Sequence, residues 1–325
     1  MTRASNNDQL PILARGRARL LLPNDATTGV IDTSEERVST PLVICFHGSG
    51  ETCSPSWDAL ATKLVAEMRC RVLLYDRGPG NLRAADVAAE MWEYVSGAKN
   101  RMIANESPRD ESARRDHDDK HDLRGPYLLI AHSYGGAFAR AFVQHEHEVS
   151  AHRKSRCVAE RVVGLVLVET GQEGGLDAAL DEWQIRGAVM GARPVCVVRG
   201  NSLLQKWREL EAKERAAEAE MGANVEIQMR MRMRMQTLAA EREMLLRVDA
   251  EDERLKRRQL GLSRNSRFVH VPDCGHDVVR QRPGEVVAAV RWVLENAESI
   301  VEEGEEAMGV WESALKWVRR VGLRR

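Results

Sequence analysis

The chain has 325 residues, 48 Lys and Arg against 49 Asp and Glu, and 43 % hydrophobic residues. This length can bury a large core and fits one α/β domain. The charge balance excludes a generally basic nucleic-acid-binding protein, and the hydrophobic content excludes global disorder. Six scattered cysteines without a C-x-x-C pair indicate reduced thiols rather than a disulfide scaffold. They are Cys45, Cys53, Cys70, Cys157, Cys196 and Cys274.

The N-terminal segment has no uninterrupted apolar stretch of signal-peptide length. No run anywhere in the sequence approaches the ~20 apolar residues that a membrane span requires. We therefore expect a cytoplasmic protein with no membrane span.

Short, uninterrupted apolar runs recur along the chain and predict strands that are buried on both faces. These runs are Leu42–Phe46, Arg71–Tyr75, Tyr127–Ala131, Val162–Val168, Val195–Val198 and Phe268–Val271. Helical patterns lie between them, at Ser56–Arg69, Ala84–Ser96, Gly136–Glu148 and Gly284–Ala297. The alternation predicts an α/β fold with a mostly parallel central sheet and helices on both faces. Catalytic and binding loops should then gather at the carboxyl ends of the strands.

Three segments fall outside this alternation. Asn100–Arg124 is dense in charge and predicts a solvated loop insertion. Ser202–Arg264 lacks proline and is rich in strong helix formers, so we expect two helices of roughly 20 residues with a break near Gly222. Ser299–Arg325 predicts a further amphipathic helix.

The segment from Ala131 to Gly136, which reads Ala-His-Ser-Tyr-Gly-Gly, has the strongest catalytic pattern. It directly follows a predicted strand and directly precedes a predicted helix. A serine in such a turn is held out of the sheet on a strained backbone, where it can act as a nucleophile. Ala131 and Gly135, two positions to either side of Ser133, are small, as a crowded turn requires. The alternative is an ordinary turn whose serine caps the helix.

A glycine-rich turn, His47-Gly48-Ser49-Gly50, ends an earlier predicted strand. Glycines let the backbone turn so that an amide N–H can face a developing oxyanion. We expect the amides of Ser49 and of Tyr134, the residue after the nucleophile, to form an oxyanion hole. A plain glycine-rich turn without this role is the alternative.

Gly275-His276 follows the last predicted core strand. A histidine on a loop at the carboxyl end of a strand can reach a serine at the end of another strand. A surface-loop histidine is the alternative, but the order of glycine-rich turn, serine turn and late histidine favours a catalytic set.

In these residues the chain resembles the α/β-hydrolase superfamily, and in detail its single-domain members from filamentous fungi. The motifs that carry the resemblance are His47–Gly50, Tyr75–Gly80, Ala131–Gly136 and Gly275-His276. The resemblance covers roughly Val38–Asn201 and Phe268–Leu294, more than half of the chain. The resemblance implies one α/β-hydrolase domain over residues 1–325, with its core at about 38–201 and 265–297. Members of this superfamily most often place a lid after the strand that ends at Glu169, whereas the large helical insertion 202–264 comes one strand later. We expect this insertion to be the lid, and residues 299–325 to form the C-terminal helix.

The acid of the expected triad is less clearly marked. Many family members have an aspartate after the strand found here at Val195–Val198, but the following Arg-Gly-Asn-Ser has no carboxylate. The preceding strand ends at Glu169, where other branches of the superfamily place the acid. A carboxylate at the end of a buried strand needs a partner, and Glu169 could orient His276. A purely structural Glu169, and Asp273 or Asp277 as the acid, are the alternatives.

The start of the insertion and a short helical stretch near Asp177–Ile185 are expected to roof the cleft over Ser133. The expected substrate pocket comprises Trp57, Trp183, Leu203 and Trp207. A hairpin docked elsewhere, or used as an oligomerisation arm, is the alternative, and a homodimer through the hairpin or the C-terminal helix stays open. We expect no cofactor and no metal, because His145 and His147 are two residues apart and lie on different sides of a helix.

These residues predict a serine hydrolase that acts on a small-molecule ester or thioester through an acyl-enzyme, with Ser133, His276 and Glu169 as the triad. Cleavage of a carbon–carbon bond, or transfer of the acyl group to an acceptor other than water, would use the same site. A different kind of alternative is a non-catalytic scaffold that keeps the fold and uses its charged helices as partner surfaces.

Overall fold

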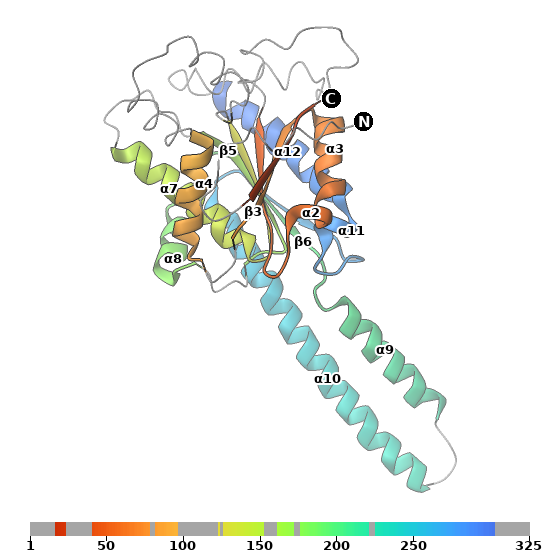
Figure 1. Cartoon of the computed structure of the whole chain (residues 1–325). Helices are drawn as coiled ribbons and strands as arrows, with labels where there is room; N and C mark the ends of the chain where they lie inside the picture. Colours follow the sequence, from red (N-terminus) through yellow and green to blue (C-terminus); the bar gives the residue numbers. More distant parts are fainter. Residues whose placement is uncertain are drawn as a thin grey trace, which may run out of the picture.

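The computed structural model describes residues 17–23, 41–78, 82–96, 123, 126–152, 161–171, 176–220 and 225–302. Within these residues, seven strands form one sheet in the order β1-β3-β2-β4-β5-β6-β7 (Figure 1). β1 pairs antiparallel with β3, and all other neighbouring strands of this sheet run parallel. The strands are β1 Arg17–Leu21, β2 Leu42–Phe46, β3 Arg71–Asp76, β4 Tyr127–His132, β5 Val162–Val168, β6 Val195–Arg199 and β7 Ser266–His270.

The predicted α/β fold class is therefore confirmed, and β2 and β5 have the predicted bounds. β1 is not predicted from the sequence, because it has no uninterrupted apolar run. It is an edge strand that reads Arg-Ala-Arg-Leu-Leu, and its first three residues are only partly covered. Such a strand lacks the two-sided burial that makes a central parallel strand recognisable.

Helices cover both faces of the sheet. On one face α3 Asp58–Met68, α11 Val278–Gln281 and α12 Pro283–Glu302 bury their apolar sides in one core cluster. On the other face α4 Ala84–Ser96 and α7 Gly135–His152 build a second cluster. The short elements α2 Cys53–Ser56, α8 Ala178–Arg186 and η2 Gln259–Leu262 complete the body. The five cysteines among the described residues are unpaired and buried.

The insertion forms two helices, α9 Leu204–Ala219 and α10 Val225–Arg258. The prediction of a hairpin was right, but the halves are unequal, because α10 has 34 residues against 16 in α9. The hairpin starts at the carboxyl edge of the sheet, and its far part extends away from the body (Figure 1). The two helices are held together by a narrow seam of six buried apolar residues, with Trp207 packed at its edge. The six are Leu203, Leu210, Ala217, Met231, Leu238 and Leu245.

Two sequence-based predictions fall mainly on residues that the structure does not describe. Of the charged insertion Asn100–Arg124, Leu123 is the one described residue. Of the C-terminal helix predicted at 299–325, the described part is the end of α12, at Glu302, and residues 303–325 lie outside the described residues.

Candidate active site

Ser133 lies in the tight turn between β4 and α7, at the carboxyl edge of the sheet. Its φ is 52°, in the left-handed region that non-glycine residues seldom adopt. The Ser133 amide donates to the carbonyl oxygen of Val168 at the end of β5, over 3.0 Å, and the Gly136 amide donates to the Ser133 carbonyl over 2.9 Å. These bonds hold a strained turn of the kind that displays a nucleophile.

The two glycines after Tyr134 are required by crowding at the start of α7. A Cβ on Gly135 would lie 2.1 Å from the carbonyl oxygen of Phe46, and one on Gly136 would lie 2.8 Å from Cγ2 of Thr170. The sequence pattern predicts a small residue at Gly135, and the structure supplies the reason. α7 begins in contact with the end of β2, so the backbone at this turn has no room for a side chain.

We expect Gly135→Ala to lower the free energy of unfolding by about 2 kcal/mol or more, because the clash is with backbone that cannot rotate away. Gly284→Ala is the matched control, since a Cβ there would meet nothing within 4 Å. Urea unfolding of both variants measures the difference. Equal stability of the two variants would contradict the crowding described at this turn.

The turn after β2 approaches the serine turn at Gly48, where a Cβ would lie 3.1 Å from Cβ of Ser133. Arg77, which follows β3, holds this turn by donating to the carbonyl oxygens of His47, over 2.8 Å, and Gly48, over 2.5 Å. Because the C=O and N–H of one trans peptide point in opposite directions, the amide of Ser49 points away from Arg77. Neither this amide nor that of Tyr134 has an acceptor in the described part of the chain.

His276 follows β7 and lies beside Glu169, which follows β5. Nδ1 of His276 is 2.9 Å from Oε2 of Glu169, although 107 residues separate them in sequence. The Glu169 side chain is fully buried, whereas that of His276 is 48 % exposed and can meet a substrate. The two alternative acids are paired with other side chains, Asp273 with Arg282 and Asp277 with Arg280.

Glu169 is held as an ionised carboxylate in spite of its burial. Its backbone φ is 53°, so it shares the left-handed conformation of Ser133. Its Oε1 accepts from the Gly200 amide over 2.6 Å, and its Oε2 accepts from Oγ of Ser202 over 2.5 Å. Burial opposes ionisation, but the hydrogen bond with His276, the charge of Lys256 and the Ser202 hydroxyl outweigh it and lower the pKa of Glu169 to about 2.

A second histidine, His132, connects the parts of this site, and the sequence analysis did not single it out. It precedes Ser133, is 1 % exposed, and its Nε2 lies 3.0 Å from the carbonyl oxygen of His276. Oε2 of Glu51, from the glycine-rich turn, lies 3.5 Å from its Nδ1. Burial lowers the pKa of His132, but the nearby Glu51 and the carbonyl raise it above its usual value overall. The neighbouring His132 lowers the pKa of Glu51.

The structure does not bring the four expected pocket residues together. Trp57 is 1 % exposed and lies in the core cluster that α3 and α12 build. Trp183 of α8 is 46 % exposed and its ring faces His147. Leu203 and Trp207 pack in the seam of the hairpin, where the Trp207 ring lies under Arg242. Apolar residue type alone could not reveal these positions, because tryptophan and leucine serve equally in a core, a seam or a pocket.

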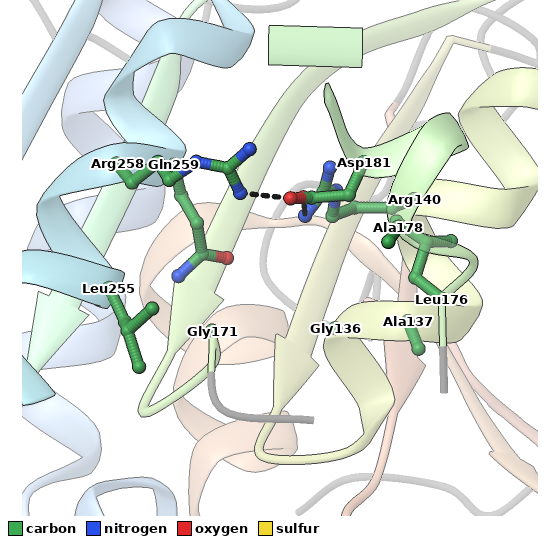
Figure 2. Close-up of a pocket in the computed structure, with 10 residues that line it drawn as sticks. All are labelled: Gly136, Ala137, Arg140, Gly171, Leu176, Ala178, Asp181, Leu255, Arg258 and Gln259. Atoms are coloured by element: carbon green, nitrogen blue, oxygen red, sulfur yellow. Dashed lines mark hydrogen bonds and ion pairs between the residues drawn. The ribbon is translucent and has the colours of Figure 1, made fainter. Parts of the chain in front are cut away.

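A cavity of about 210 Å³ lies beside the serine turn (Figure 2). Its walls come from the first turn of α7, the segment after β5, α8, and the foot of α10 with the first residue of η2. The lining residues are Gly136, Ala137, Arg140, Gly171, Leu176, Ala178, Asp181, Leu255, Arg258 and Gln259. The insertion thus contributes to this cavity through the end of its second helix and not through the first turns of α9.

Among the described residues, no cluster of three or more His, Cys, Asp or Glu side chains could hold a metal ion. Their helices also include none with both the length and the apolar character needed to cross a membrane.

Comparison with known proteins gives a family match that agrees with this geometry. The sequence model of the alpha/beta hydrolase family matches residues 43–290. Among solved structures, the chain is similar to dienelactone hydrolase from Anabaena variabilis, with 14 % identity, a TM-score of 0.38, and coverage of 90 % of this chain and 94 % of that chain. It is also similar to Est1E from Butyrivibrio proteoclasticus, with 12 % identity, a TM-score of 0.42, and coverage of 91 % of this chain and 98 % of that chain.

A third similar structure belongs to epoxide hydrolases of the alpha/beta hydrolases superfamily from metagenomes of hot environments. It shares 13 % identity with this chain, has a TM-score of 0.36, and the match covers 86 % of this chain and 95 % of that chain. A search of curated proteins found no match.

Proposed function

We propose that this chain, which belongs to the alpha/beta hydrolase family, is a serine hydrolase that cleaves a carboxylic ester or thioester through an acyl-enzyme. The observation that supports the proposal most is the 2.9 Å contact between Nδ1 of His276 and Oε2 of Glu169. Both residues follow parallel strands that end at the same edge of the sheet as the strained Ser133 turn.

In the proposed reaction, Oγ of Ser133 attacks the carbonyl carbon of the substrate while Nε2 of His276 takes the hydroxyl proton. Glu169 accepts a hydrogen bond from Nδ1–H of His276, which fixes the tautomer of the ring and stabilises its protonated form. The amides of Ser49 and Tyr134 bind the oxyanion, and His276 then returns the proton to the leaving alcohol or thiol. Water, deprotonated by His276, attacks the acyl-serine; the bond between the acyl carbon and Oγ then breaks, His276 returns the proton to Oγ of Ser133, and the acid leaves.

The serine itself weighs against an epoxide hydrolase, whose covalent chemistry needs an aspartate at this turn. Carbon–carbon bond hydrolysis and acyl transfer to another acceptor would use the same proposed serine, and a product analysis distinguishes them from ester hydrolysis. The non-catalytic scaffold is the remaining alternative, and it predicts no reaction at Ser133.

The direct test is hydrolysis of p-nitrophenyl esters by the purified chain. We expect a burst of about one p-nitrophenol per chain whenever deacylation is slower than acylation, followed by steady turnover. A folded chain that releases no p-nitrophenol from acetyl, butyryl or octanoyl esters and does not react with a fluorophosphonate would contradict the proposal.

We further propose that the acyl group enters the cavity beside the serine turn. Its volume of about 210 Å³ is below the ~300 Å³ at which drug-sized ligand pockets begin, so we expect a preference for short acyl chains. Leu255, at the foot of α10, forms part of the wall (Figure 2).

Leu255 is one of the apolar residues in a lining that also holds Arg140, Asp181 and Arg258. Leu255→Ala is expected to widen the cavity on its apolar side and raise kcat/KM for butyryl relative to acetyl esters about tenfold, the effect typical of one methylene in apolar contact. Leu246→Ala, on the same helix at a position 55 % exposed, is the matched control and should leave the ratio unchanged. If both variants keep the ratio of the unmodified chain, the acyl group does not occupy this cavity.

A further inference from the structure

A buried lysine at the foot of the hairpin reaches the proposed triad acid. Lys256 lies near the end of α10, is 1 % exposed, and its Nζ is 3.3 Å from Oε1 of Glu169. Asp252, one turn earlier on the same helix, is 5 % exposed and forms an ion pair with the same ammonium group. Burial of a charged group is unfavourable unless partners compensate it, and here the carboxylates of Glu169 and Asp252 compensate the ammonium group of Lys256.

The two oxygens of Glu169 serve different cationic partners. Oε2 accepts from Nδ1 of His276 and from Ser202, whereas Oε1 accepts from the Gly200 amide and faces Lys256. A protonated His276 and the Lys256 ammonium therefore share the negative charge of one carboxylate. The closer the ammonium is to Glu169, the less that carboxylate favours the proton on His276.

The negative charge of Asp252 opposes this effect, because it neutralises the ammonium group of Lys256 and so favours the proton on His276. Asp252 also accepts a hydrogen bond from Nε of Arg199 over 3.0 Å. Arg199 is 2 % exposed and forms further ion pairs with Asp249 and Glu253. The foot of α10 is thus attached to the end of β6 by one arginine and three carboxylates. Docking of this helix places Lys256 next to Glu169, and Asp252 next to Lys256.

We propose that Lys256 is a positioning residue of the active site, whose charge, balanced by Asp252, sets the pH at which His276 becomes able to accept the serine proton. The hairpin then contributes to the site by holding Lys256 and Asp252, near the end of α10, in place. This inference rests on the proposed function, since it assigns a role to Lys256 only if His276 and Glu169 act on Ser133.

Other charged and titratable groups also face the acid and the histidine. His132 of β4 contacts the carbonyl oxygen of His276, and Glu51 of the glycine-rich turn lies against His132. The remaining groups lie around the site and are paired among themselves or with the foot of α10: Arg199 of β6, and Asp273, Asp277, Arg280 and Arg282 around the His276 loop. None of them is changed in the variants below, so a shift between variants reports the substituted charge.

The test is the pH dependence of fluorophosphonate labelling of Ser133 in Lys256→Met and Asp252→Asn. Labelling needs an unprotonated His276, so its rate rises with pH through a midpoint. Loss of the positive charge should move the midpoint to higher pH by about half a unit or more, and loss of the negative charge should move it to lower pH. Lys213→Met is the matched control, because Lys213 pairs with Glu241 on the exposed part of the hairpin, and its midpoint should match the unmodified chain.

Opposite shifts cannot come from general loosening of the site, which would act in one direction or only reduce the amplitude. If Lys256→Met does not fold, Asp252→Asn alone still decides, since a midpoint that stays or rises overturns the inference. Unmodified chain that labels normally, with both variants at its midpoint, overturns the inference and leaves the proposed function intact. Unmodified chain that does not label at all overturns the proposed function itself.

Discussion

Ser133→Ala is expected to reduce ester turnover by about 10⁴-fold or more and to abolish fluorophosphonate labelling, while the chain stays folded. The expected loss is large because the proposed acyl-enzyme cannot form without the hydroxyl, and binding and the oxyanion donors alone supply little of the rate. Serine and alanine both carry a Cβ, so the backbone φ of 52° strains them alike. The free energy of unfolding should therefore change little in Ser133→Ala.

Ser266→Ala is the control for this variant, because Ser266 begins β7, is exposed, and lies at the opposite end of its strand from the His276 loop. It should keep full activity and labelling. Ester turnover by Ser133→Ala at the rate of this control would show that another residue is the nucleophile.

His276→Ala is expected to cause a loss of similar size, since a serine and its general base act as a unit. Without the imidazole, the proposed mechanism has lost the general base that takes the serine proton. The measurements are steady-state turnover of a short p-nitrophenyl ester and the rate of fluorophosphonate labelling, both at a fixed pH above 7.

His270→Ala is the matched control, because His270 ends β7, is exposed, and is six residues from His276. We expect it to turn over esters normally. A loss of only a few-fold in His276→Ala would remove this histidine from the proposed mechanism and leave the contact with Glu169 as a structural one.

Much of the fold could be predicted because parallel strands that are buried on both faces leave uninterrupted apolar runs. β5, for example, reads Val-Val-Gly-Leu-Val-Leu-Val and is buried throughout. The edge strand β1 and the unequal halves of the hairpin could not be predicted in this way. The length of α10 depends on its ion pairs with Arg199 and on the seam with α9, which are contacts between distant residues.

The residues of the candidate site likewise fall into those that the sequence predicts and those that only the tertiary contacts reveal. Ser133, Glu169 and His276 follow strands that the sequence marks, and parallel neighbours bring such residues to one edge. Lys256 and Glu51 lie on a helix and in a turn whose contact with the site depends on tertiary packing alone. Trp57, which lies in the core, and Trp207, which packs on the seam of the hairpin, show the converse difficulty. An aromatic side chain near a loop indicates burial without saying against which surface.

The most direct measurement of the central claim is the identity of the residue that a fluorophosphonate modifies. Trypsin should release residues 125–140 as one peptide, in which Ser133 is the single serine. We predict that mass spectrometry of the labelled, digested chain places the adduct on Ser133 of this peptide, with about one adduct per chain at saturation. An adduct on any other residue, or a folded chain that saturating probe leaves unmodified, would contradict the assignment of Ser133 as the nucleophile.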